Sequence, residues 1–245
     1  IKNEDIKKII DGKNSAIIIK KFLKKEDCKK IIRKISSMNI ERDSNKFNHI
    51  GPFLMNYTTK KEKYFQNAEK ANQVFKKIFS NVENPVNKIK TTISKIFPDY
   101  KISGIRENQR NYALCTIRRH ENGKSIPLHK DNVSYEGVEY EVSKINTQLS
   151  CILHLQETEK GGNLSIYNKR WKKKLEKYRE IEFGYNSNIK KKSLSDTIET
   201  KLGDLVIINP NYLHEVKEIQ GISDRVTLGM FFGIENKTKK IFFWA

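Results

Sequence analysis

The sequence predicts an α+β protein in which strands predominate, with a helical N-terminal part followed by an antiparallel sandwich or barrel. Up to about residue 100, apolar residues recur mainly at helical spacing, whereas from about residue 110 the chain changes to short β-type runs. Many short strands without alternating helices are typical of antiparallel folds. The 245 residues suffice for one large domain with a proper core.

The N-terminal part contains one expected strand and three expected helices. Residues 15–23, SAIIIKKFL, are strand-like, and residues 24–38 carry apolar side chains at helical spacing opposite a lysine-rich face. A second helix is expected near residues 62–79. A third begins at Pro85, which suits a first helical position, and ends before Pro98. We expect the apolar stripes of these helices to face the core.

The C-terminal part contains six runs that predict strands. They are residues 111–119, 147–155, 163–167, 195–201, 204–209 and 225–233. Residues 168–192 interrupt this series, and seven of the eleven residues from Lys169 to Arg179 are basic. We interpret 168–192 as an insertion between two strands, either a lid or a plain solvated loop.

The composition does not decide which kind of partner the protein binds. Lys and Arg number 48 against 29 Asp and Glu, so the formal charge is +19, which favours anionic partners but also fits a lysine-rich solvated surface. Three cysteines, Cys28, Cys115 and Cys151, lie in apolar runs and predict buried thiols in the cytoplasm. No apolar run is long enough to span a membrane. Because residue 1 is isoleucine, a preceding leader remains an open alternative.

A possible metal site begins with the triplet His129, Lys130 and Asp131. Further along, GDLVIINPNYLHEV contains an apolar strand, an Asn-Pro break and then His214. Two imidazoles and one carboxylate on one side of an ion suit Fe(II), and they leave coordination positions open, unlike a closed structural zinc site. On an extended strand the first and third residues of the triplet point the same way, so Lys130 is expected to point away from the metal.

Arg225 follows His214 by eleven residues and opens the run RVTLGMFFG. A guanidinium there can pair with the distal carboxylate of 2-oxoglutarate, which the open metal positions would chelate. Thr227 lies on the same face of the expected strand and can add its hydroxyl. The alternative is that Arg225 is a surface residue after the turn at Ser223 and Asp224.

Residues 110–233 resemble the Fe(II)/2-oxoglutarate-dependent dioxygenases, particularly their prolyl-hydroxylase-like branch, through LHKDN, GDLVIINPNYLHEV and RVTLGMFFG in that order. SAIIIKKFLKKEDCKKIIRKI is similar to the opening strand and helix of that branch. The resemblance implies a double-stranded β-helix, a cupin-like jelly roll, with N-terminal helices packed on one sheet. Residues 1–245 would then form one oxygenase domain, with the strand and helices in 1–105 and the jelly roll in 106–235.

The resemblance also assigns roles. It implies that His129, Asp131 and His214 bind Fe(II) and that Arg225 anchors 2-oxoglutarate, with O2 as the second cosubstrate. In SCILHLQE, His154 matches a position that often donates to the same carboxylate, although a lone histidine in an apolar strand is usually a core residue. Arg118 or Arg119 would line the pocket and face the substrate, or face solvent.

The carboxylate of Asp131 narrows the expected reaction. Related amino-acid halogenases have a small residue at this position, which opens a place for halide, so Asp131 favours hydroxylation. The chain also lacks the additional arginine that follows the anchor in the nucleic-acid dealkylating branch, because VTLGMFFGI follows Arg225. Nucleic acid is therefore not the expected partner, despite the positive charge.

We expect hydroxylation of an unactivated C–H bond in a small molecule, such as a free amino acid, with release of succinate and CO2. Asn132 and Trp244 are further candidates for substrate contact, or are ordinary packing residues. Two alternatives stay open: a hydroxylase of prolyl or other residues in a protein or peptide, and a non-catalytic jelly roll that binds nucleic acid or another polyanion. The oligomeric state does not follow from the sequence.

Overall fold

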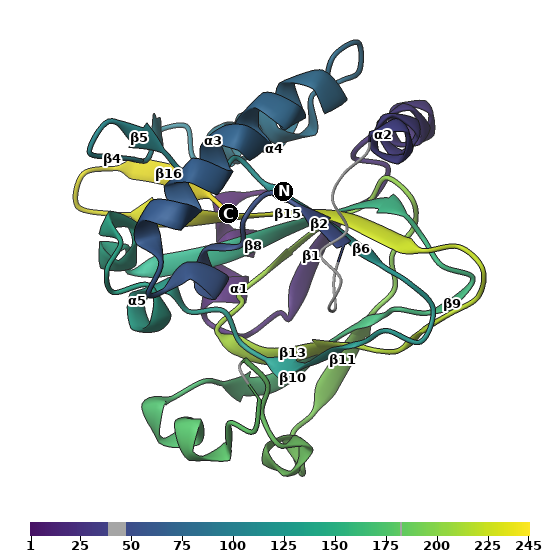
Figure 1. Ribbon diagram of the computed structural model, residues 1–245. Coiled ribbons are helices and arrows are strands. Elements are labelled where there is room, and N and C mark those ends of the chain that lie inside the picture. The colour runs from purple at the N-terminus through teal and green to yellow at the C-terminus, as the bar shows by residue number, and fades with distance from the viewer. Residues whose placement is uncertain (39–47, 182) are drawn as a thin grey trace.

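The computed structural model describes residues 1–38, 48–181 and 183–245, and it shows two facing β-sheets with helices over the larger one (Figure 1). The helices α2, α3 and α4 lie on one side of the larger sheet, and the smaller sheet lies on the other (Figure 1). The helical segments are α1 (Asn3–Ile10), α2 (Lys25–Ser37), η1 (Leu54–Tyr57), α3 (Lys61–Ile78), α4 (Pro85–Ile96), α5 (Val133–Glu136), η2 (Glu141–Lys144), η3 (Lys173–Tyr178) and η4 (Ser187–Lys190). None of these described helices is long and apolar enough to cross a membrane.

The larger sheet has eight strands and is built around the long strand β15. Its main path, in spatial order, is β1 (Ala16–Ile19), β12 (Leu205–Ile208), β8 (Thr147–Gln156), β15 (Arg225–Glu235), β16 (Lys240–Trp244) and β3 (Lys101–Gly104). The first half of β15 also pairs with β6 (Thr116–His120), which in turn pairs with β2 (Asn48–Ile50). All pairs in this sheet are antiparallel except β16 with β3.

The smaller sheet carries four antiparallel strands. Their spatial order is β11 (Ser195–Ile198), β10 (Leu164–Arg170), β13 (Tyr212–Val216) and β7 (Ile126–His129). Two short ribbons complete the β-structure, β9 (Lys160–Gly161) with β14 (Ile219–Gln220) and β4 (Arg106–Glu107) with β5 (Arg110–Asn111). The two facing sheets form the double-stranded β-helix that the resemblance implied.

Strand alternation gives the larger sheet one apolar face and one partly polar face. Val226, Leu228, Met230 and Phe232 of β15 join the main hydrophobic core, which also contains Ile6, Ile31, Phe75 and Ile89 from the helices. The intervening residues of β15 point into the space between the sheets, because successive side chains on a strand alternate. Arg225 and Thr227 are therefore interior polar residues, and both are buried.

The expected helices occur close to their predicted bounds. In α4, Pro85 occupies the first turn, and the Asn84 side chain accepts hydrogen bonds from the amides of Val86 at 3.0 Å and Asn87 at 3.1 Å. This is the N-terminal capping that the sequence pattern favours. The sequence analysis did not predict the short helix α1 or the strand β16. In β16, Trp244 pairs with Phe231 of β15, so the aromatic C-terminal run extends the larger sheet.

Residues 168–192 pack on the outer side of the smaller sheet, and Figure 1 shows their short helices beyond β10 and β13. Leu128 and Leu213 point outward from β7 and β13, and they form a separate apolar cluster with Tyr167, Leu175, Tyr185 and Ile189. The amide of Tyr185 donates to the carbonyl of Leu128 at 2.8 Å, along the free edge of β7. Much of this segment is thus tied to the sheet that carries the histidines.

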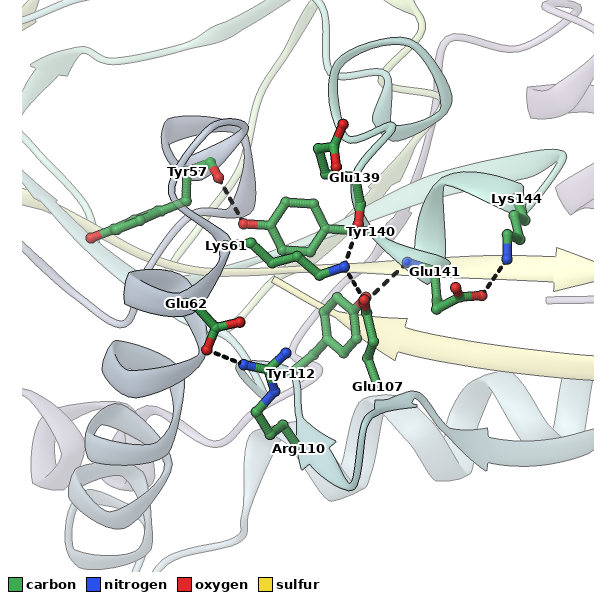
Figure 2. Close-up of polar contacts among 10 residues, drawn as sticks. All are labelled: Tyr57, Lys61, Glu62, Glu107, Arg110, Tyr112, Glu139, Tyr140, Glu141 and Lys144. Carbon is green, nitrogen blue, oxygen red and sulfur yellow. Dashed lines mark hydrogen bonds and ion pairs between the residues drawn. The ribbon is translucent and has the colours of Figure 1, made fainter.

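A buried carboxylate joins α3 to the segment that follows the His-x-Asp triplet (Figure 2). Glu107, on β4, pairs with Lys61 of α3 and accepts a hydrogen bond from the Tyr112 hydroxyl at 2.6 Å. It also accepts the amide of Glu141 at 3.1 Å, while the Lys61 ammonium donates to the carbonyl of Glu139. Although burial raises the pKa of Glu107, these partners outweigh it and hold the pKa below its usual value. The contacts fix the loop between α5 and η2.

Candidate metal centre

Three potential metal ligands converge between the two sheets. His129 ends β7 and His214 lies in β13, and the two residues are directly paired in the antiparallel register. Their ring centroids are 4.1 Å apart, and His214 Nε2 lies 3.8 Å from Asp131 Oδ2. One potential ligand atom from each of the three residues lies within 4.8 Å of the other two. Within the described parts of the chain, this is the only such histidine, cysteine and carboxylate group.

Local hydrogen bonds orient both imidazoles. His129 Nδ1 lies 2.8 Å from the carbonyl of Pro127, and His214 Nδ1 lies 2.8 Å from the carbonyl of Tyr212. A carbonyl only accepts, so each Nδ1 carries the proton and each Nε2 is left free for a metal. Burial is the main cause that lowers the pKa of each imidazole to about 4, so both are neutral near pH 7. Neutral imidazole is the form that binds metal.

The third ligand is positioned by the turn after β12. The Asp131 amide donates to the carbonyl of Pro210 at 2.9 Å, so the Asn-Pro break recognised in the sequence holds the triplet beside β13. Burial raises the pKa of Asp131, while His214 and Arg118 oppose this. The donor set therefore fits a divalent ion with open positions, as Fe(II) oxygenases require.

Lys130 points away from the other two residues of the triplet. Its side chain is buried, and its ammonium lies 2.6 Å from Glu136 Oε1, 4.9 Å from the ring centroid of Trp171 and 5.2 Å from that of Tyr135. Trp171 belongs to the 168–192 insertion. The structure thus confirms the alternation of side-chain directions that the sequence predicted for this triplet. The Lys130 side chain points toward the insertion.

The interior face of the larger sheet offers a site for an anion opposite the histidines. Arg225 is 2% exposed and forms no hydrogen bond or ion pair with other described residues, and its Nε is fully buried. Burial lowers the pKa of this guanidinium to about 10, which leaves it charged at neutral pH. A buried charge without a partner is costly, so the arrangement fits the carboxylate of 2-oxoglutarate. Thr227 lies beside it on the same face.

His154 lies across from Thr227 in the β8–β15 pair. Its Nδ1 lies 2.6 Å from Glu157 Oε1 and 3.1 Å from Thr200 Oγ1, whereas its Nε2 is buried without a partner among the described residues. Burial lowers the pKa of His154, and Glu157 opposes this. Because Nδ1 donates to Glu157, the Nε2 of the neutral ring is an acceptor, and it can donate to an anion beside Arg225 only when the ring is protonated.

Three residues near these groups were not expected from the sequence. His120 pairs with Arg225 in the β6–β15 register, and burial is the main cause that lowers its pKa to about 3. Alternation from Arg118 along YALCTIRRH would have placed it on the interior face. Glu157 orients His154, and the Phe183 ring lies edge-on to His129 with centroids 5.9 Å apart. The contact of Phe183 has no local sequence signal, because it depends on how the insertion folds back.

The four substrate candidates lie in different surroundings. Arg118 points to the interior, whereas Arg119 points outward and pairs with Asp224 at 2.5 Å. Asn132 caps α5, since its side chain accepts the amide of Tyr135 at 3.0 Å. Trp244 is fully buried in an aromatic cluster, with its ring centroid 5.8 Å from that of Phe231. Its position fits packing, and substrate contact by Asn132 or Trp244 stays a prediction.

This fold and donor set are found in the 2-oxoglutarate-dependent non-haem iron oxygenases, which use Fe(II), 2-oxoglutarate and O2. Residues 2–245 match the family described as carrier-protein-independent halogenase WelO5, and the chain belongs to that family. The alternative of a non-catalytic binding module is therefore set aside. The chain is also 27% identical over 181 residues to leucinostatins biosynthesis cluster protein S of Purpureocillium lilacinum, covering 71% of this chain and 73% of that protein.

Solved structures share the fold at low sequence identity. An N-substituted L-amino acid dioxygenase from Burkholderia ambifaria AMMD superposes with a TM-score of 0.67 at 17% identity, covering 98% of this chain and 91% of that one. HygX from Streptomyces hygroscopicus, solved with nickel and 2-oxoglutarate bound, gives a TM-score of 0.58 at 9% identity, with coverage of 95% and 87%. These structures support the double-stranded β-helix.

Proposed function

We propose that this protein hydroxylates an unactivated C–H bond of a small, amino-acid-like molecule. The proposal rests chiefly on one observation, the convergence of His129, Asp131 and His214 into a three-ligand site opposite the unpartnered Arg225. Fe(II) with 2-oxoglutarate and O2 supplies an oxidant for such bonds, with release of succinate and CO2. The protein's part is to bind, orient and exclude water.

In this proposal, the triad holds Fe(II) through two imidazole Nε2 atoms and the carboxylate of Asp131. Arg225 pairs with the distal carboxylate of 2-oxoglutarate, and the Thr227 hydroxyl donates a hydrogen bond to it. His154 adds a second hydrogen bond through Nε2–H when the ring is protonated, with Glu157 as its counter-charge. Because the imidazoles are neutral, they bind the ion without first losing a proton. Burial of the triad and of the residues around Arg225 removes competing water, which strengthens each of these contacts.

Halogenation is the second candidate, since the family description names a halogenase. A halide must occupy a position on the ion that a protein ligand leaves open. Here Asp131 lies within ligand distance of both histidines, so that position is taken, which favours hydroxylation. The mass of the product formed in chloride-containing buffer separates the two: a gain of one oxygen supports hydroxylation, and a gain of chlorine overturns it.

A small-molecule substrate is supported by the related N-substituted L-amino acid dioxygenase, which has the same fold along nearly the whole chain. The competing hypothesis is a protein or peptide substrate that docks on the basic insertion. Succinate release measured with amino-acid derivatives and with peptide libraries distinguishes the two. We place the reaction in the cytoplasm, supported by three cysteines that are buried and form no disulfide.

Substitution of the triad tests the proposed function directly. We expect His129→Ala and His214→Ala each to lose tight Fe(II) binding and 2-oxoglutarate turnover. Asp131→Ala should lose both in chloride-free buffer, where no halide can fill the position of the carboxylate. The matched control is Asp99→Ala, which removes an exposed carboxylate after α4 and should retain both properties. Iron is measured by metal analysis after gel filtration, and succinate by mass spectrometry. Normal turnover by a correctly folded triad variant would contradict the assignment.

A further inference from the structure

Arg118 occupies the interior face of the larger sheet beside the proposed cosubstrate site. It pairs with Thr227 in the β6–β15 register, and its side chain then runs along β15 toward Gly229. A methyl group at Gly229 would lie 3.2 Å from Arg118 Nη2, so the absence of a side chain there makes room for the guanidinium. The charged group therefore lies farther along β15 than Thr227.

The Arg118 guanidinium has no hydrogen-bond or ion-pair partner in the described ranges. It stacks on Phe53, with Cζ 4.9 Å from the ring centroid. Asp131 is its main favourable charge, yet the two groups form no ion pair within 4 Å. Burial lowers the pKa of Arg118, although part of the residue stays accessible to solvent. The guanidinium is thus largely buried, still accessible to solvent, and without a hydrogen-bond partner among the described residues.

Position separates Arg118 from the cosubstrate anchor. Four residues of extended strand, from Arg225 to Gly229, place their Cα atoms about 13 Å apart, although the charges of Arg118 and Arg225 still act on each other. Arg225, Thr227 and His154 gather near the start of β15, whereas the Arg118 head lies near Gly229 and Phe53 and interacts electrostatically with Asp131. An anion bound by Arg118 would consequently lie near the metal ligands but away from the distal carboxylate of 2-oxoglutarate.

The nearby charges leave Arg118 without a close anionic partner. Glu157 acts on Arg225, at the start of β15, whereas the favourable charge on Arg118 is that of Asp131, which would bind the ion. An enclosed cation gains most from a hydrogen-bonded anionic partner, and a guanidinium fork matches a carboxylate in two parallel hydrogen bonds.

We propose that Arg118 binds a carboxylate of the substrate and so places the rest of that molecule beside the metal. This deepens the proposed function and rests on it: the substrate is a carboxylic acid. The guanidinium lies over the Phe53 ring, which limits its movement on that side. Gly229 leaves the space that this placement needs.

Binding of matched neutral and anionic probes tests the proposal. The probes are N-acetyl-L-leucine, N-acetyl-L-phenylalanine and free L-leucine, each with its primary amide. Equilibrium dialysis is carried out anaerobically with the Fe(II) and 2-oxoglutarate-loaded protein. We expect at least one acid to bind about tenfold or more tightly than its amide, as one charge-assisted contact predicts. A wild-type protein that shows no preference for any acid overturns the proposal.

Three variants test whether the preference for the acid over its amide depends on Arg118. Arg118→Met should abolish the preference for the acid, and Arg118→Lys should restore part of it, because the charge returns without the fork. The matched control Arg119→Met removes the outward-facing neighbour and should keep the full preference. If Arg118→Met keeps the preference while it remains folded by circular dichroism, the proposal is wrong.

A separate titration distinguishes substrate binding by Arg118 from binding of the cosubstrate. Calorimetry should give Arg118→Met nearly the wild-type affinity for 2-oxoglutarate, and Arg225→Met a much weaker one. A large loss of 2-oxoglutarate affinity in Arg118→Met would make Arg118 a second cosubstrate anchor and overturn the substrate assignment. Failure of the wild-type protein to bind 2-oxoglutarate at all would instead contradict the proposed function.

Discussion

At the scale of single residues, the triplet His129, Lys130 and Asp131 divides its side chains between two environments. The outer two point to the interior and the middle one points outward, to Glu136 and the rings of Tyr135 and Trp171. Glu136 is shared, since Arg179 Nη2 also lies 2.7 Å from it. Lys130 therefore contacts the insertion, although it lies between two proposed metal ligands in the sequence.

We predict that Lys130→Met leaves Fe(II) affinity within about threefold of wild type, because the side chain does not face the ion. The same variant should lower the free energy of unfolding by about 1–2 kcal/mol, a modest loss because Glu136 keeps Arg179 as a partner. Metal titration and urea unfolding measure the two effects. Asp131→Asn serves as the comparison and should lose much more metal affinity. An equal loss in both variants would contradict the outward orientation.

At the scale of elements, β13 presents opposite functions on its two faces. His214 faces the interior, whereas the next residue, Glu215, faces the insertion. Glu215 accepts hydrogen bonds from Lys190 of η4 at 2.8 Å, Tyr167 at 2.7 Å and Lys217 at 2.5 Å. Although burial raises the pKa of Glu215, these donors outweigh it and lower the pKa to about 2. This carboxylate therefore tethers the insertion to the strand that carries His214, a proposed metal ligand.

The low pKa of Glu215 predicts a pH-dependent part of the stability. A carboxyl with a lowered folded-state pKa stabilises the fold fully above its unfolded pKa, and this contribution is lost as pH falls toward the folded value. The loss should therefore develop between pH 4.5 and about 2. We expect Glu215→Gln to lower the free energy of unfolding by about 2 kcal/mol at pH 6 and by much less near pH 3.

Urea unfolding at several pH values measures this difference. The matched control is Glu69→Gln, an exposed position on α3, which should follow the wild-type profile. A Glu215→Gln effect of the same size at pH 6 and near pH 3 would show that the charge of the carboxylate does not stabilise the fold.

At the scale of the whole molecule, the jelly roll encloses the charge of Arg225 between its sheets, without a partner among the described residues. Helices cover the outer face of the larger sheet. Val206 and Ile208 of β12 pack against Leu164, Ile166 and Val216 of the smaller sheet, so apolar contacts hold the two sheets together without a metal. Two buried charged groups, Asp131 and Arg225, lie between the sheets. Other buried charged groups, such as Glu107, Lys130 and Glu215, lie elsewhere and have ion-pair partners. Ligands that pair with Asp131 and Arg225 should stabilise the folded state.

Thermal unfolding in the presence of ligands tests this expectation. Saturating Fe(II) and 2-oxoglutarate under anaerobic conditions should raise the midpoint, with about 2.7 kcal/mol gained at a ligand concentration one hundred times Kd. Arg225→Met should keep the increment from the metal and lose that from 2-oxoglutarate. Arg33→Met, exposed on α2, is the control and should keep both. A full 2-oxoglutarate increment in Arg225→Met would contradict its role as the anchor.

The sequence by itself determined much of the local structure and the chemistry of the metal ligands. Helical spacing, Pro85 and the β-patterned runs placed most elements, because propensity and hydrophobic periodicity act within a few residues. The order of His129, Asp131, His214 and Arg225 on such runs, with the resemblance they carry, predicted an iron and 2-oxoglutarate enzyme. Strand alternation also predicted the outward direction of Lys130.

Only the tertiary structure decided which residues meet across the two sheets. Strand alternation left Arg118 and Arg119 equivalent until the β6–β15 register assigned them to opposite faces. The partners of His154, the contact of Phe183 with His129 and the packing of 168–192 on the outer face depend on pairings between distant parts of the chain. Local patterns do not encode such pairings, because they arise when separate apolar surfaces are buried against one another.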